Sequence, residues 1–80
     1  MRKGLADEAI SAYRRALAAK SGYADAHYNL GVAFIKKDMH GDALNAFKEF
    51  IKYCRPQDSR LDKAKETIGK LQLHLAGRKR

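Results

Sequence analysis

The side chains that could carry chemistry are one cysteine and three histidines, and their spacing does not suit catalysis or metal binding. Cys54 is the single cysteine, and its register with Ile51 places it on the inward face of a helix, where a thiol behaves as a small apolar group. The histidines, His27, His40 and His74, fall on three separate segments, whereas zinc needs about three or four ligands together. The sequence therefore predicts a half-buried structural cysteine and histidines that pack or face solvent.

The acidic residues and glycines also lack a catalytic pattern. The two close carboxylate pairs are Asp7 with Glu8, and Asp62 with Glu66. Adjacent acids diverge on a helix, and Glu66 can pair with Lys63 or Lys70 as a surface residue. The glycines form neither a GxGxxG nor a GxxxxGK[ST] phosphate-binding loop. The sequence predicts no enzymatic activity and implies no cofactor.

Length and composition indicate one small globular domain. A chain of 80 residues buries only about 60% of its unfolded surface, so its stability depends on regular packing or on a partner. The apolar fraction of 45% against 32% charged residues is typical of a folded protein. No apolar run approaches the ~20 residues of a membrane span, and no signal-peptide pattern opens the sequence. With a single cysteine, these features favour the cytoplasm.

The formal net charge of +8 is concentrated at the two ends of the chain. Five of the 17 basic residues lie there: Arg2, Lys3, Arg78, Lys79 and Arg80. Without them, residues 4–77 carry only +3. Such an excess affects solubility and association with polyanions and says little about the fold.

Turn-forming residues divide the chain into four segments with helical periodicity. These interruptions are Ser21-Gly22, the stretch 38–41, and Arg55-Pro56. The expected helices span residues 5–20, 24–37, 41–54 and 58–76. In the fourth, Asp58 or Ser59 can cap the first turn, Ser59-x-x-Asp62 has the form of a capping box, and Gly77 is the expected stop. Its apolar stripe is Leu61, Ala64, Ile68, Leu71 and Leu75.

The first and third predicted helices are related by an offset of 34 residues. The matched pairs are Glu8 and Asp42, Ala9 and Ala43, Ile10 and Leu44, Ala12 and Ala46, Tyr13 and Phe47, and Leu17 and Ile51. An acid, an alanine and an aliphatic residue recur in order, with an aromatic residue four positions after the alanine. The two helices are therefore copies of one repeated unit, with the second helix between them.

Small and large apolar residues recur at fixed spacing within this repeat: His27-x-x-Leu30-Gly31-x-x-Phe34, then Ala43-x-x-x-Phe47 and Pro56. This pattern resembles the tetratricopeptide repeat (TPR), a helix–turn–helix unit of about 34 residues. The resemblance implies an all-α, antiparallel four-helix array. Its expected parts are the second helix of a partial repeat (4–23), a full repeat (24–57), a capping helix (58–77) and a basic tail (78–80). Gly31 and Ala43 would let the paired helices approach closely.

Four positions depart from the family pattern, and one of them is Pro56, which falls one residue late, with Ser21 in the corresponding place of the preceding copy. His27 stands where the family usually has a large aromatic residue, commonly Trp. Phe50 occupies a position that is usually small, and Asp38 replaces a turn glycine for which Gly4 stands in the preceding copy. We expect these residues to change the local packing and not the fold.

The resemblance implies a non-catalytic protein–protein interaction module. In similar proteins the first helix of each repeat lines a concave groove that holds a peptide or a partner helix. Carried over to this sequence, the expected partner-binding residues are Asp25, Tyr28, Asn29, Val32, Ile35 and Lys36. In the alternative interpretation, Tyr28, Val32 and Ile35 pack on neighbouring helices.

Two further modes of association remain open at this stage. Arg60, Lys63 and Lys70 form a basic flank of the fourth helix that, with the tail 78–80, could bind a nucleic acid or another polyanion, although such a face is usually only solvated. One and a half repeats also leave an edge of the first helix uncovered, and the candidate contacts there are Leu5, Ile10 and Leu17. The chain is then either part of a longer array or self-associates through that edge.

Overall fold

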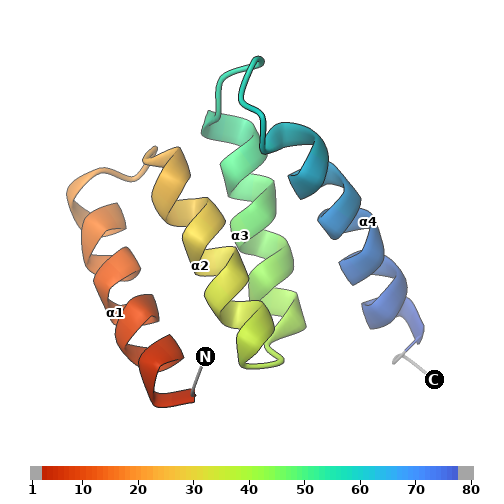
Figure 1. Cartoon of the computed structure of the whole chain (residues 1–80), viewed down its shortest axis with the longest axis horizontal. Coiled ribbons are helices and arrows are strands. Elements are labelled where there is room, and N and C mark those ends of the chain that lie inside the picture. The colour runs from red at the N-terminus through yellow and green to blue at the C-terminus, as the bar shows by residue number, and fades with distance from the viewer. Residues whose placement is uncertain (1–2, 78–80) are drawn as a thin grey trace.

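The computed structural model describes residues 3–77, and the side chains of residues 4–77. It consists of four helices: α1 (Lys3–Ala19), α2 (Ala24–Lys36), α3 (His40–Tyr53) and α4 (Leu61–Gly77). Strands are absent from residues 3–77. The helices lie side by side in chain order, and each runs antiparallel to the one before it (Figure 1). This architecture confirms the predicted all-α antiparallel array.

The array is thin in one direction, with extents of 39 × 33 × 19 Å. The shortest extent corresponds to about two helix diameters of roughly 10 Å each. The main contacts join successive helices, α1 to α2, α2 to α3 and α3 to α4. Each helix is therefore supported mainly by its neighbours in the sequence, as expected for a repeat array.

The tightest packing joins α2 to α3 at Gly31. A Cβ atom placed on Gly31 would lie 2.8 Å from two ring atoms of Phe47, and Phe47 itself is only 2% exposed. Ala43, on the same face of α3, is fully buried. The prediction that small residues allow these two helices to approach is confirmed. The buried core cluster contains Ile10, Leu30, Ala33, Phe34, Ala43, Ala46, Phe47, Phe50, Ala64 and Leu71.

Two of the repeated pairs of α1 and α3 are covered to different degrees. Tyr13 is half-buried whereas its counterpart Phe47 is buried, and Ala9 is half-buried whereas Ala43 is buried. The difference arises because α3 contacts both α2 and α4, whereas the main contacts of α1 are with α2 alone. At the pair Ala9 and Ala43, where the residue type is the same, position in the array sets the burial.

The turn between α2 and α3 keeps its geometry without a glycine. Asp38 has φ 60°, in the left-handed region that Asp and Asn tolerate better than most residues. The backbone N–H of Asp38 donates to the carbonyl of Ile35 at 2.9 Å, and that of Met39 donates to the carbonyl of Phe34 at 2.9 Å. The aspartate thus performs the role of the turn glycine that the family pattern leads one to expect.

The start of α4 differs from the prediction. The helix begins at Leu61, three residues after the expected start at Asp58. Asp58 instead closes a turn before the helix, because its Oδ1 accepts the backbone N–H of Arg60 at 2.8 Å. Gly77, the expected stop, is itself the last described residue of α4. The predicted basic tail, 78–80, lies outside the described residues.

Candidate functional site

The six residues predicted to bind a partner all lie on α2 and divide into two groups. Asp25, Asn29 and Lys36 are exposed. Tyr28, Val32 and Ile35 are half-buried and pack against the core cluster. Part of the alternative interpretation therefore holds, because the three apolar side chains do contact the core while keeping some exposed surface. Together the two groups form a polar and apolar face, which we call the α2 face.

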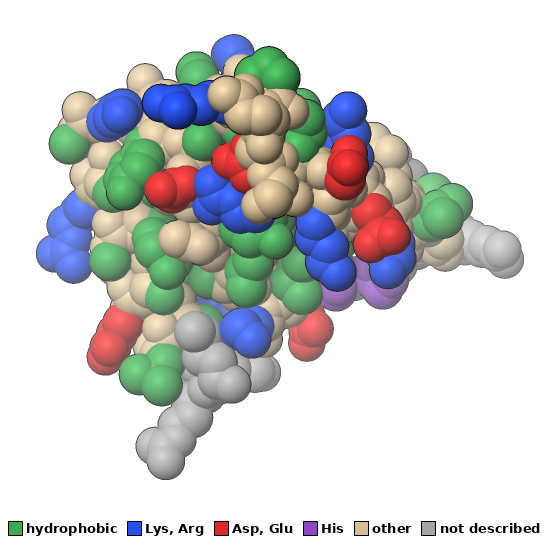
Figure 2. Space-filling model, turned by 45° about the horizontal axis from the view of Figure 1, so that its top comes forward, with side chains coloured by type: hydrophobic (Ala, Val, Ile, Leu, Met, Phe, Trp, Pro, Cys, Tyr) green, Lys and Arg blue, Asp and Glu red, His purple; other side chains and the backbone are tan. Residues whose placement is uncertain are grey.

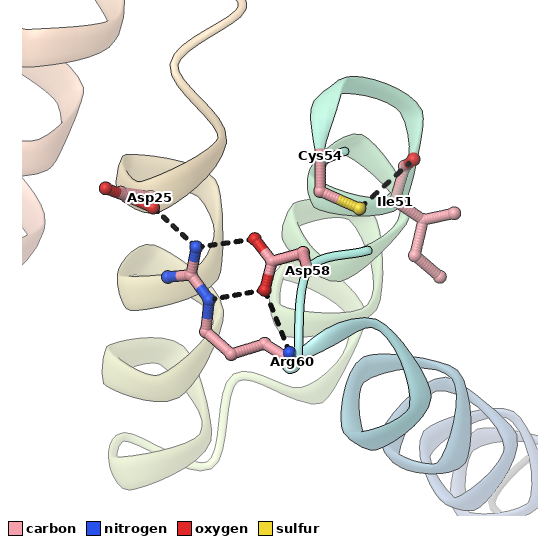
Figure 3. A network of polar contacts seen from close by, with 5 residues as sticks. All are labelled: Asp25, Ile51, Cys54, Asp58 and Arg60. Carbon is pink, nitrogen blue, oxygen red and sulfur yellow. Dashed lines mark hydrogen bonds and ion pairs between the residues drawn. The ribbon is translucent and has the colours of Figure 1, made fainter. Parts of the chain in front are cut away.

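Arg60 reaches the α2 face from the turn that precedes α4. Its guanidinium carbon lies 5.2 Å from the ring centroid of Tyr28 and 5.1 Å from that of Phe50. The Nη2 group donates to Asp25 Oδ1 at 2.6 Å and to Asp58 Oδ2 at 2.8 Å, while Nε donates to Asp58 Oδ1 at 3.1 Å (Figure 3). The planar guanidinium thus rests on two aromatic rings and links α2 to the α3–α4 loop.

Hydrogen bonds within this network stabilise the ionised forms of Asp58 and Arg60. The side-chain hydrogen bond from Arg60, followed by the bond from its backbone N–H, lowers the pKa of Asp58 from 3.8 to about 2. The hydrogen bonds to Asp58 and then to Asp25 raise the pKa of Arg60. The Asp58 side chain is 17% exposed and that of Asp25 is 55% exposed. An acidic group of a partner could therefore reach Arg60 most readily by replacing Asp25.

Sequence reasoning did not include Arg60 in the partner-binding set. It assigned this residue, with Lys63 and Lys70, to a basic flank of the last helix. In the structure Arg60 turns toward α2, and Lys70 Nζ lies 3.9 Å from Glu66 Oε1, a pairing that the sequence did suggest. One signal in the sequence could have identified Arg60, because it follows Asp58 by two residues in a loop. Its contact with Asp25, however, joins residues 35 positions apart in the chain, which local spacing does not reveal.

The cysteine and His27 have the structural environments that were predicted. Cys54 is half-buried, packs against the core, and its Sγ lies 3.8 Å from the carbonyl oxygen of Ile51. His27 is buried, with Nε2 2.9 Å from the carbonyl oxygen of Ser21. Its ring stacks on Tyr53 with centroids 5.7 Å apart. The histidine at the unusual family position is thus part of the packing.

The rings of the other two histidines pack against each other, although their positions in the sequence did not suggest a contact. The ring centroids of His40, at the start of α3, and His74, near the end of α4, are 4.1 Å apart. Buried His40 Nδ1 has no hydrogen-bond partner among the described residues. Within residues 3–77, no group of three or more His, Cys, Asp or Glu side chains could hold a metal ion.

Figure 2 shows one face of the molecule, where acidic and basic side chains lie close together above apolar ones. The Asp25–Arg60–Asp58 network joins two carboxylates to one guanidinium. In this network the charged guanidinium lies over the half-buried ring of Tyr28. The arrangement suits recognition and offers no nucleophile with an adjacent base.

Comparison with known proteins supports the helical-repeat interpretation. Residues 1–38 match the family model described as a TPR repeat. This segment covers α1 and α2, the predicted second helix of one repeat and first helix of the next. No curated protein and no solved structure matches the chain significantly. Each helix within residues 3–77 is too short or too polar to cross a bilayer. The matched segment is thus similar to a TPR repeat, and the antiparallel array of helices fits that similarity.

Proposed function

We propose that this chain is a non-catalytic interaction module that binds a peptide or a partner helix on the α2 face. TPR domains generally mediate protein–protein interaction, which supports a polypeptide partner. The observation that carries the proposal is the arrangement of α2, where the half-buried side chains of Tyr28, Val32 and Ile35 lie beside exposed polar residues. Interfaces of this kind combine an apolar centre with a polar rim.

Individual side chains have distinct roles in this proposal. The Tyr28 ring packs edge-on against two rings, with its centroid 5.5 Å from that of Phe47 and 5.0 Å from that of Phe50. Because these contacts already fix the side chain, little side-chain entropy would be lost when a partner packs on it. Asn29 can pair with the backbone of a bound segment, and exposed Lys36 can pair with an acidic side chain. Arg60 rests on Tyr28 and is already paired with Asp25 and Asp58, so it is not counted as a free cation.

The alternative function, polyanion binding by the α4 flank, has weaker support. Of its three named cations, Arg60 is engaged by two carboxylates and Lys70 lies near Glu66. The tail 78–80, which that function also used, lies outside the described residues. The cytoplasm remains the expected location, on the basis of the single cysteine.

The test is selection from a random peptide library, followed by measurement of Kd for the selected peptides by fluorescence anisotropy. We expect Asn29→Ala, Val32→Ala and Lys36→Ala each to weaken binding, by about fivefold to thirtyfold for a contact worth ~1–2 kcal/mol. Lys48→Ala, an exposed position on α3, is the matched control and should leave Kd unchanged. Far-UV circular dichroism verifies that each variant is folded. Peptides that bind all three α2 variants as tightly as the parent would show that the α2 face is not the binding site.

A further inference from the structure

A second surface feature lies at one end of the helices, where the α1–α2 turn is close to the loop between α3 and α4. The two segments border a cleft of about 410 Å³. Small-molecule sites in proteins usually measure about 300–1,000 Å³, so the cleft is large enough for a ligand. Its chemically distinctive residues are Lys20, Tyr23, Asp25, Tyr53, Arg55 and Asp58.

The aromatic residues of the cleft are unusually exposed for their size. Tyr23 is 40% exposed and Tyr53 is 39% exposed. The Tyr53 ring is nevertheless held in place, because it stacks on His27 with an interplanar angle of 11°. Gly22 also packs on it so closely that an added Cβ would lie 3.1 Å from Tyr53 Cδ1. The cleft thus presents one fixed ring and one further ring to solvent.

Each exposed tyrosine is accompanied by a lysine. Lys20 Nζ lies 5.5 Å from the ring centroid of Tyr23, and Lys52 Nζ lies 5.2 Å from that of Tyr53. Arg55 adds a third exposed cation. In the part of the chain with described side chains, none of these three cations forms an ion pair within 4.0 Å. They are therefore free to receive an anionic group.

The acids of the cleft offset these cations only in part, because one of their two negative charges is neutralised by Arg60. Asp25 and Asp58 both accept hydrogen bonds from Arg60, so their charge is directed at that guanidinium. The cleft consequently combines two exposed aromatic rings with two cations, Lys20 and Arg55, and Lys52 lies over the ring of Tyr53 without lining the cleft itself. A ligand that satisfies both features needs a flat aromatic group and a phosphate within a few ångströms of each other.

We propose that this cleft binds a nucleotide, with the base stacked on an exposed tyrosine ring and the phosphate held by Lys20, Lys52 and Arg55. A base replaces the lysine ammonium over the ring, and the released ammonium contacts the phosphate. The ligand is either a free nucleotide or one unit of a single strand, since both present the same base and phosphate. An acidic peptide would pair with the cations but would leave the tyrosine rings without a stacking partner.

The test measures binding to four probes at 0.15 M salt: adenosine monophosphate, a single-stranded thymidine ten-mer, an abasic ten-mer with the same number of phosphates, and a ten-residue glutamate peptide. Binding to the full chain is followed by NMR chemical shifts for the monophosphate and by fluorescence anisotropy for the labelled oligomers. We expect the monophosphate or the thymidine ten-mer to bind at least fivefold more tightly than the abasic and acidic probes, which corresponds to the low end of one stacking contact. Monophosphate binding assigns a free nucleotide, and binding of the ten-mer alone assigns a single strand.

Variants separate stacking from charge. Tyr23→Ala should weaken binding at least fivefold while Tyr23→Phe, which keeps the ring, changes it less than twofold. Lys20→Gln should weaken binding of the ten-mer and reduce the slope of log K against log salt by about one. Lys65→Gln, which removes an exposed charge on α4, is the matched control. We would abandon the proposal if none of the probes bound, if the abasic or glutamate probe bound as tightly as the bases, or if Tyr23→Ala bound like the parent.

Discussion

The close approach of α2 to α3 leads to a prediction about two glycines. Replacing Gly31 with alanine would place a methyl group 2.8 Å from the Cε2 and Cζ atoms of Phe47, whereas ordinary contact begins at 3.4 Å. The ring would have to retreat by about 0.6 Å. Phe47 is only 2% exposed, so its neighbours oppose that movement. Gly69, on α4, has no atom within 4 Å of the corresponding position and is the matched control.

The expected magnitudes follow from two opposing effects. Alanine in a helix interior is more favourable than glycine by about 0.8–1 kcal/mol, whereas overpacking a core costs about 1–3 kcal/mol. Gly31→Ala should therefore lower the free energy of unfolding by roughly 0–2 kcal/mol. Gly69→Ala, which gains helix propensity without a clash, should raise it by about 0.5–1 kcal/mol. The two variants should differ by about 1–3 kcal/mol.

Thermal unfolding followed by far-UV circular dichroism measures this difference. For a domain of this size, 1 kcal/mol corresponds to about 4–8 °C in Tm. Shortening the opposing side chain by Phe47→Leu should cost less in the Gly31→Ala background than in the parent, because the ring that clashes is gone. If Gly31→Ala raised Tm as much as Gly69→Ala, the helices would not be in the contact described, and the role assigned to Gly31 would be wrong.

Three further predictions concern the turns and the uncovered edge. The pKa of Asp58 is about 2 in the folded chain, compared with its ordinary value of 3.8. Its ionised form therefore stabilises the fold above about pH 4, and this contribution is lost as the pH falls toward 2. Urea unfolding measured from pH 2 to 5 should show a weaker acid dependence of stability for Asp58→Asn than for the parent, and an unchanged dependence would contradict the assignment. Asp38→Gly should raise the stability by up to about 1 kcal/mol, because glycine adopts the observed φ of 60° without strain, and a fall in Tm would count against this reason. Leu5 is 53% exposed on α1; if that edge self-associates, sedimentation should show a dimer for the parent and a monomer for Leu5→Lys, whereas a parent that stays monomeric at high concentration would exclude the edge.

Local periodicity was sufficient to predict the helices and their repeat. An apolar residue every three or four positions specifies a helix that buries one face, and the offset of 34 that pairs Tyr13 with Phe47 predicted two equivalent helices. The sequence also showed that Asp38 stands at the α2–α3 turn where the family pattern has a glycine. The starts and ends of helices were less secure, as at Asp58, because a polar residue before a helix can either cap its first turn or close a turn ahead of it.

The edge of α1 illustrates a limit of the same reasoning. Ile10 and Leu17 were candidate external contacts, but Ile10 is buried in the core and Leu17 packs against it, which leaves Leu5 exposed. A period of 3.6 residues shows which side chains share a face. It does not show where on that face a neighbouring helix ends.

The amino-acid sequence by itself determined the four helices, the small residue at Gly31 and the resemblance to TPR repeats, since each depends on residues close together along the chain. Only the tertiary structure decided that Arg60 lies on Tyr28 and pairs with Asp25, that His40 meets His74, and that Tyr23 and Tyr53 border one cleft. Those contacts join residues some 30 or more positions apart. They depend on how loops cross the ends of packed helices, and neither helix periodicity nor residue spacing encodes that path.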